Sequence, residues 1–170
     1  MQIKGSCHCG AVRFTASCHT PYPYMRCYCS ICRKTAGGGG YAINIKAEYG
    51  SLTVEGNEHI GTYHAWMDPE RTERSNGERR FCRECGSALW VWDPRWPEMF
   101  HPHASCIDTP APKPSENQHL LVEFAPSWVE VPEDSARDTV HRVVGLPMKP
   151  ILEQMESIDD WHKNRGLLVE

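Results

Sequence analysis

The sequence predicts a mainly β fold in a single domain with a short helical tail, and three observations indicate it. Short segments in the first ninety or so residues alternate apolar and polar side chains, as in Val12-Arg13-Phe14 and Leu52-Thr53-Val54, which is typical of half-buried strands. The segment 93–116 holds many prolines and predicts an irregular connection. From Pro150 to Arg165 the apolar residues instead recur at helical spacing.

The predicted strands are short and are separated by turns or polar segments. Residues 68–80 are polar and charged and predict an exposed loop. Gly37 to Gly40 form an unbroken glycine run, which no regular element favours. The strands that we expect are Ala11–Ala16, Tyr41–Ile45, Leu52–Glu55, Gly61–Trp66, Ala88–Trp92 and His119–Phe124.

The C-terminal tail predicts a helix with one apolar face. Ser157 with Asp160 could instead begin a second short helix there. We expect residues 1–130 to form the domain and residues 131–170 to form an extension whose helix packs on it. The apolar face would be made by Ile151, Leu152, Met155, Ile158 and Trp161.

Composition and charge exclude several classes of function. A formal net charge of -4 over 170 residues argues against nucleic acid as a partner, because phosphate binding favours a basic surface. No apolar run approaches the roughly eighteen residues of a membrane helix, so no membrane partner is expected. The first residues lack the apolar segment of a signal peptide, so we expect a cytoplasmic protein.

The nine cysteines indicate metal binding rather than disulfides. Their number is odd, and most lie in C-x-C or C-x-x-C pairs. Cysteines two apart rarely form a disulfide with each other, but their thiolates converge easily on a metal ion. Cys18 and Cys106 lie outside these pairs, and we expect both to be buried, unreactive thiols.

Two cysteine pairs far apart in the sequence predict a closed structural metal site. Cys7 and Cys9 would place two thiolates on one side of an extended segment. Cys82 and Cys85 form a zinc knuckle in which Gly86 can adopt the left-handed conformation of a tight turn. Four thiolates complete a tetrahedral zinc site, and joining segments about seventy residues apart stabilises a long loop.

A third group, Cys27, Cys29 and Cys32, predicts an open site. Three thiolates within six residues can hold one metal ion and leave its fourth position for water or substrate, which is typical of catalytic zinc. Arg33 and Lys34 follow directly and could attract an anionic substrate. The alternative is a second structural site whose fourth ligand is one of four other residues: His8, His19, Cys18 or Cys106.

These motifs in this order resemble the glutathione-dependent formaldehyde-activating (Gfa) family, which includes centromere protein V. The motifs are G-S-C-H-C-G-A-V, C-x-C-x-x-C-R-K with glycines, and F-C-x-x-C-G-S-A-L, and the match runs from about Gly5 to Trp92. The resemblance implies an Mss4-like (β-tent) fold with two zinc ions. It assigns Cys7, Cys9, Cys82 and Cys85 to the structural zinc, and Cys27, Cys29 and Cys32 to the catalytic zinc.

The resemblance also implies a function, zinc-dependent carbon–sulfur lyase chemistry on a small thiol and an aldehyde. The prototype makes S-hydroxymethylglutathione from glutathione and formaldehyde. The sequence departs from the family beside the open site: Tyr28 stands where many members have histidine, and Gly40 where an aromatic residue is common. Tyr28 is therefore assigned no role, and no general acid or base is identified.

The sequence leaves two alternatives open. One is a zinc-stabilised binding module without catalysis. The other is a lyase of the same fold for a different thiol or electrophile, with specificity set by the aromatic segment Trp90–Pro114. If the chain is an enzyme, three thiolates make the open site negatively charged, so we expect its zinc to be loosely held.

Overall fold

The computed structural model describes residues 1–113, 117–133 and 138–141. The predicted helical tail lies outside these residues. The chain divides into two compact units, which are described separately: unit 1 is Met1–Cys18 with Asn44–Ala111, and unit 2 is His19–Ile43 with the chain from Pro112 onward. In the described part of the chain, no helix has the length and apolar character that crossing a membrane requires.

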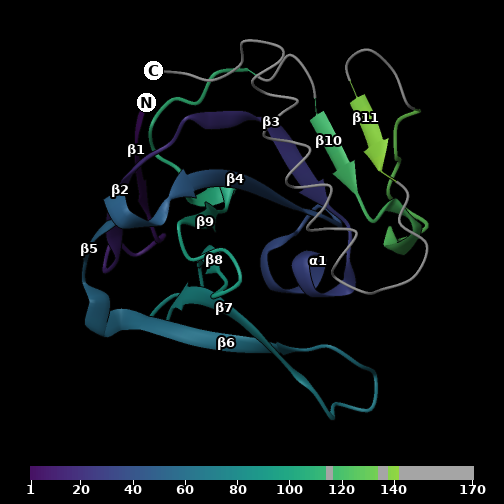
Figure 1. Ribbon diagram of the computed structural model, residues 1–170, viewed down its shortest axis with the longest axis horizontal. Coiled ribbons are helices and arrows are strands. Elements are labelled where there is room, and N and C mark those ends of the chain that lie inside the picture. The colour runs from purple at the N-terminus through teal and green to yellow at the C-terminus, as the bar shows by residue number, and fades with distance from the viewer. Residues whose placement is uncertain (114–116, 134–137, 142–170) are drawn as a thin grey trace. The chain divides into compact units, whose positions relative to one another are not determined.

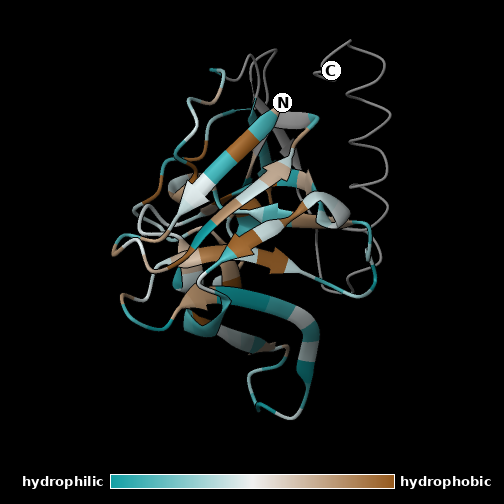
Figure 2. Ribbon diagram, turned by 90° about the vertical axis from the view of Figure 1, so that its left-hand side faces the viewer, coloured by the Kyte–Doolittle hydropathy of each residue, from teal (hydrophilic) through white to brown (hydrophobic). Residues whose placement is uncertain are grey.

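The chain is mainly β, as the sequence predicts. In unit 1 a three-stranded antiparallel sheet has the order β1-β2-β5. Ile3 in β1 is buried and its neighbours are exposed, and Figure 2 shows this strand alternating between hydrophilic and hydrophobic residues. The strands are β1 (Gln2–Ser6), β2 (Arg13–Ser17) and β5 (Thr53–Glu55).

A second antiparallel arrangement in unit 1 has the order β4-β9-β8-β7-β6. The long β6 and β7 lie side by side in Figure 1 and pair from Ile60↔Cys82 to Trp66↔Arg74. The strands are β4 (Ala42–Glu48), β6 (Ile60–Trp66), β7 (Arg74–Cys82), β8 (Ala88–Trp92) and β9 (Met99–Pro102). Short 3-10 helices cover Tyr49–Ser51, Asn57–His59 and Ala104–Cys106.

Aromatic side chains fill the core of unit 1. Trp90 is buried between Phe14 and Phe100, with ring centroids at 5.3 and 6.0 Å in edge-to-face geometry. Tyr49 stacks on Trp92 at 5.1 Å. Trp90 therefore belongs to the core, although the sequence leaves it open as a specificity residue.

Unit 2 is built on parallel strands. β10 (Asn117–Leu120) pairs in parallel with both β3 (Thr20–Cys27) and β11 (Asp138–His141), and Figure 1 shows β10 beside β11. One helix, α1 (Ser30–Ala36), follows β3, and a 3-10 turn (Val122–Phe124) follows β10.

Several elements differ from the prediction. The segment 68–80 is not wholly a loop, because β7 begins at Arg74; its polar residues lie between β6 and β8, where both neighbours satisfy its backbone. The proline-rich segment contains β9. The strand expected at His119–Phe124 ends at Leu120, because Leu121 adopts a left-handed backbone with φ of 60°.

Candidate metal centres

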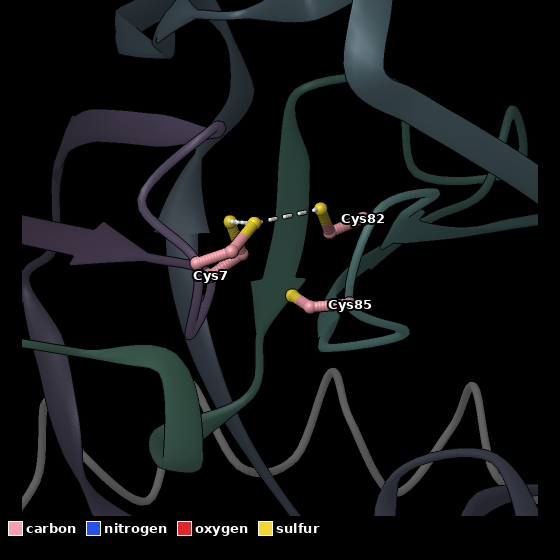
Figure 3. A group of neighbouring side chains, drawn as sticks. Cys7, Cys82 and Cys85 are labelled. Atoms are coloured by element: carbon pink, nitrogen blue, oxygen red, sulfur yellow. Dashed lines mark hydrogen bonds between the residues drawn. The ribbon is translucent and has the colours of Figure 1, made fainter.

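The four predicted closed-site cysteines come together in unit 1. The thiol sulfurs of Cys7, Cys9, Cys82 and Cys85 all lie within 4.8 Å of one another. The sulfur of Cys9 is 3.5 Å from that of Cys7 and 3.8 Å from that of Cys82. Figure 3 shows the thiols of Cys7, Cys82 and Cys85 pointing into the space between two loops.

Two tight turns present these thiols. Cys7 and Cys9 lie in a turn after β1, closed by a 3.0 Å hydrogen bond from Gly10 N to Cys7 O, so the predicted extended C-x-C segment is wrong. The second pair lies in a turn at the end of β7, where Gly86 N donates to Cys82 O at 2.9 Å. Gly86 has the predicted left-handed backbone, with φ of 74°.

The surroundings of the cysteine thiols in this cluster give them different pKa values. Hydrogen bonds from the hydroxyl and the backbone N–H of Ser87 lower the pKa of the exposed Cys85 to about 5. At Cys9, a hydrogen bond from the backbone of Ala11 lowers the pKa. The neighbouring thiols, led by Cys7, outweigh this bond and raise the pKa of Cys9 to about 12. At Cys7, burial opposes the shift, but hydrogen bonds led by that from Val12 N lower the pKa. The lowered pKa values of Cys7 and Cys85 favour thiolates in the cluster, and a cation can displace the remaining protons.

The three predicted open-site cysteines come together in unit 2. The sulfurs of Cys27, Cys29 and Cys32 lie within 4.8 Å of one another. Cys27 ends β3, and Cys29 is the N-cap of α1, where its sulfur accepts a hydrogen bond from Cys32 N at 3.3 Å. No described His, Cys, Asp or Glu of unit 2 adds a fourth ligand to this group.

The open cluster has the chemistry of a metal site. Hydrogen bonding with Cys29 and Cys32, followed by burial, raises the pKa of Cys27 well above its usual value. At Cys29, the hydrogen bond with Cys27 lowers the pKa. The hydrogen bond with Cys32 and burial outweigh it and raise the pKa of Cys29 to about 11. Three close thiols, of which Cys27 and Cys29 resist ionisation, fit a soft divalent cation, which would stabilise all three thiolates.

Apolar groups surround the open cluster on its buried side. Cys27 and Cys32 pack with Ala42 and Leu121, and Ala36 packs against them. Cys27 and Cys32 are only 7% and 6% exposed, whereas Cys29 is partly exposed. Among the described residues of the cluster, Cys29 is therefore the cysteine most accessible to solvent.

Tyr28, to which the sequence assigns no role, is completely buried and lies between two cysteines of this cluster in the sequence. Its hydroxyl lies 2.8 Å from Nδ1 of His119 in β10, and the two rings stack with centroids 5.8 Å apart. Tyr41 packs against Tyr28 at 5.3 Å. Sequence analysis missed His119, because nothing in a short strand distinguishes it and its contact with Tyr28 joins residues 91 apart.

Cationic side chains flank the open cluster along the chain. The guanidinium of Arg26 lies 5.2 Å from the ring centroid of Tyr41. Among the described residues, no hydrogen-bond partner reaches the buried Nε atoms of Arg26 and Arg33. Arg33 and Lys34 both lie in the last turn of α1, and Lys34 is exposed.

The two remaining cysteines are buried in unit 1, as predicted. The thiol of Cys18 donates to Lys46 O at 3.0 Å. The thiol of Cys106 donates to Leu89 O at 3.1 Å, and burial raises the pKa of Cys106 to about 12. Both thiols therefore have backbone acceptors of their own.

Comparison with known proteins identifies the family. The profile of the family described as "Glutathione-dependent formaldehyde-activating enzyme" matches residues 2–122, which include all seven clustered cysteines. The chain belongs to this family. A Halomonas elongata protein named "Putative glutathione-dependent formaldehyde-activating enzyme" is 51% identical over 167 residues, which cover 98% of each chain. The resemblance seen in the sequence is thereby confirmed.

A solved structure agrees with this assignment. The crystal structure of a Rhodobacter sphaeroides protein is similar with a TM-score of 0.50 and 29% sequence identity. The likeness covers 64% of this chain and 91% of the other. It supports the mainly β fold expected for a member of the formaldehyde-activating family.

Proposed function

We propose that this chain is a zinc-dependent carbon–sulfur lyase that joins a glutathione-like thiol to formaldehyde or a similar small aldehyde. The observation that supports it most is the difference between the two cysteine clusters. Cys7, Cys9, Cys82 and Cys85 offer a complete tetrahedral set, whereas the described residues of unit 2 offer only Cys27, Cys29 and Cys32. The family name supports the thiol and the aldehyde.

In this proposal the two clusters have different tasks. The four-cysteine cluster holds a structural zinc that ties the turn after β1 to the end of β7. Cys27, Cys29 and Cys32 hold the catalytic zinc and leave one position for the substrate sulfur. When bound there, zinc would supply positive charge that favours the thiolate of the substrate over its thiol.

The reaction adds the thiol across a carbonyl group. A carbon–sulfur bond forms between the substrate sulfur and the aldehyde carbon, while the S–H bond of the thiol and the π bond of the carbonyl break. The proton that the thiol loses ends on the carbonyl oxygen, which becomes a hydroxyl. With glutathione and formaldehyde the product is S-hydroxymethylglutathione, and the reverse reaction breaks the same bond. The protein contributes by holding the sulfur in an orientation that favours attack.

The cations beside the cluster are suited to the carboxylates of glutathione. Arg33 and Lys34 lie in α1 immediately after Cys32, and Arg26 immediately precedes Cys27. The guanidinium groups of Arg26 and Arg33 carry the positive charge that a carboxylate ligand favours. These cations also offset the negative charge of three thiolates around one zinc ion.

Exchange spectroscopy tests this proposal directly. Glutathione and ¹³C-formaldehyde form the adduct spontaneously. The quantity to measure is therefore how much the enzyme increases the rate of exchange between free formaldehyde and the glutathione adduct. We expect acceleration by the wild-type chain and none by Cys29→Ala. Cys18→Ala, which removes a buried thiol outside both clusters, should keep the activity. Equal exchange rates with and without the wild-type chain would reject the lyase function.

A further inference from the structure

We infer that Tyr28 and His119 form a positioning pair that sets the geometry of the open cysteine cluster for metal binding. The inference rests on the proposed function only in requiring a metal ion at that cluster. Tyr28 lies between Cys27 and Cys29 in the sequence, and both Tyr28 and His119 are completely buried.

The local backbone explains how a tyrosine can control two cysteines. Tyr28 is the single residue between Cys27, which ends β3, and Cys29. Cys29 is the N-cap of α1, with φ of -55° and ψ of 152°, and its thiol accepts a hydrogen bond from Cys32 N. The sulfurs of Cys27 and Cys29 lie within 4.8 Å of each other, so a fixed Tyr28 between them limits how far the two thiols can separate.

Tyr28 is anchored to β10 by two hydrogen bonds. Its backbone N–H donates to Leu120 O at 3.0 Å, where β3 and β10 pair with Cys27 opposite Leu120. Its hydroxyl shares a hydrogen bond of 2.8 Å with Nδ1 of His119. The first bond fixes the backbone of Tyr28 and the second fixes its side chain. Together they restrict rotation of Tyr28 about its backbone.

The remaining thiol is held by the helix. Arg33 N donates to Cys29 O at 3.0 Å, and Cys32 N donates to the sulfur of Cys29 at 3.3 Å. Cys29 thus joins a segment anchored on β10 to the first turn of α1. Without the Tyr28–His119 bond, the helix would still hold Cys29 and Cys32 together, but the orientation of Cys27 relative to them would loosen.

Burying polar groups such as a tyrosine hydroxyl and an imidazole costs free energy unless they form hydrogen bonds. We therefore expect a buried pair of this kind to have a role beyond packing. A tyrosine hydroxyl and an imidazole lose hydration when buried, and their hydrogen bond offsets that loss. Groups that orient ligands from behind commonly change metal affinity by about ten- to a hundredfold when removed. Because the pair is one residue away from the thiols rather than bonded to them, we expect a loss near the lower end.

The test measures zinc affinity on the full chain by competition with a chromogenic zinc chelator. We expect Tyr28→Phe, which keeps the ring, to weaken the more labile zinc by about tenfold and leave the tighter zinc unchanged. Tyr49→Phe is the matched control, because it removes a tyrosine hydroxyl from unit 1. The thiolate-to-cobalt absorption of the Co²⁺-loaded open cluster should change in Tyr28→Phe and not in the control.

Two substitutions of His119 make the test independent of Tyr28. Asparagine places a hydrogen-bonding atom near the position of Nδ1, whereas glutamine places one near the position of Nε2. We therefore expect His119→Asn to hold the labile zinc more tightly than His119→Gln. This comparison decides the question if Tyr28→Phe does not fold.

The possible outcomes separate the two proposals. Unchanged affinity of the labile zinc in Tyr28→Phe, or equal weakening of both zincs, would overturn the positioning role. Equal affinities in His119→Asn and His119→Gln would also overturn it. If the wild-type chain held only one zinc, the proposed function would fail first and the positioning role with it.

Discussion

Gly40 and Val129 approach each other so closely that no side chain fits between them. A Cβ atom at Gly40 would lie 2.3 Å from Cγ2 of Val129 and 3.0 Å from Cη2 of Trp128. Gly40 also has φ of 85°, in the left-handed region. The segment after β10 therefore occupies the place where an aromatic side chain at position 40 would lie.

This contact predicts that the glycine run is constrained at particular positions rather than flexible throughout. Gly37 is a second such position, because a Cβ atom there would lie 2.3 Å from the backbone oxygen of Tyr41. Gly40→Ala should lower the free energy of unfolding by more than about 1 kcal/mol, because strain in the backbone adds to overpacking. Gly38→Ala is the matched control, since nothing lies within 4 Å of its Cβ position. Thermal unfolding of both variants checks this, and equal melting temperatures would contradict it.

Arg33 should contribute to substrate affinity rather than to the folded state. In Arg33→Gln we expect the glutathione concentration for half-maximal activity to rise about two- to fivefold, because a partly exposed charge pair contributes roughly 0.2–1 kcal/mol. Arg13→Gln in β2 is the control, as it removes an exposed arginine from unit 1. A glutathione dependence identical in Arg33→Gln and the control would exclude Arg33 from binding the thiol.

In the metal-free protein, Cys85 should react with an alkylating reagent much faster than Cys9. Both thiols are exposed, but their pKa values of about 5 and about 12 give thiolate fractions at pH 7 that differ by about 10⁵. The greater nucleophilicity of a thiolate with a high pKa recovers only about three orders of magnitude. Cys85 should therefore remain faster by about a hundredfold.

The pH dependence of alkylation follows from the same values. The rate at Cys85 should stay level between pH 6 and 8 and fall as the pH drops below about 5, since protonation then removes the thiolate. The rate at Cys9 should instead rise about tenfold per pH unit over the neutral range. Peptide mass spectrometry after timed labelling measures both, and similar profiles at the two positions would contradict the predicted difference.

Both cysteine clusters could be predicted because each is built from short cysteine motifs, although the closed cluster joins two motifs that are far apart in the sequence. Cys82 and Cys85 occupy one turn, and Cys27, Cys29 and Cys32 occupy one strand end and one helix start. The spacing that brings such thiols together depends on a few backbone angles, so it is visible in the sequence. The mainly β fold was also predictable, since alternating residues reveal strands with one buried face.

Other features could not be predicted because they depend on distant partners. β7 is polar along most of its length and becomes a strand because β6 and β8 pair with both its edges. β3 contains two prolines, which normally disfavour a strand. The bond between Tyr28 and His119 exists only because β3 and β10 pair in parallel. The domain boundaries 1–130 and 131–170 stay a prediction.

The central claim is that the two clusters differ, one closed and one open to a thiol. Zinc content per chain, measured by atomic emission on purified wild-type and Cys29→Ala protein with and without glutathione, tests this most directly. We predict nearly two zinc ions in the wild-type chain and one in Cys29→Ala, with glutathione changing the retention of the second zinc alone. A zinc content that neither the substitution nor glutathione changes would contradict the assignment of Cys27, Cys29 and Cys32 as an open site.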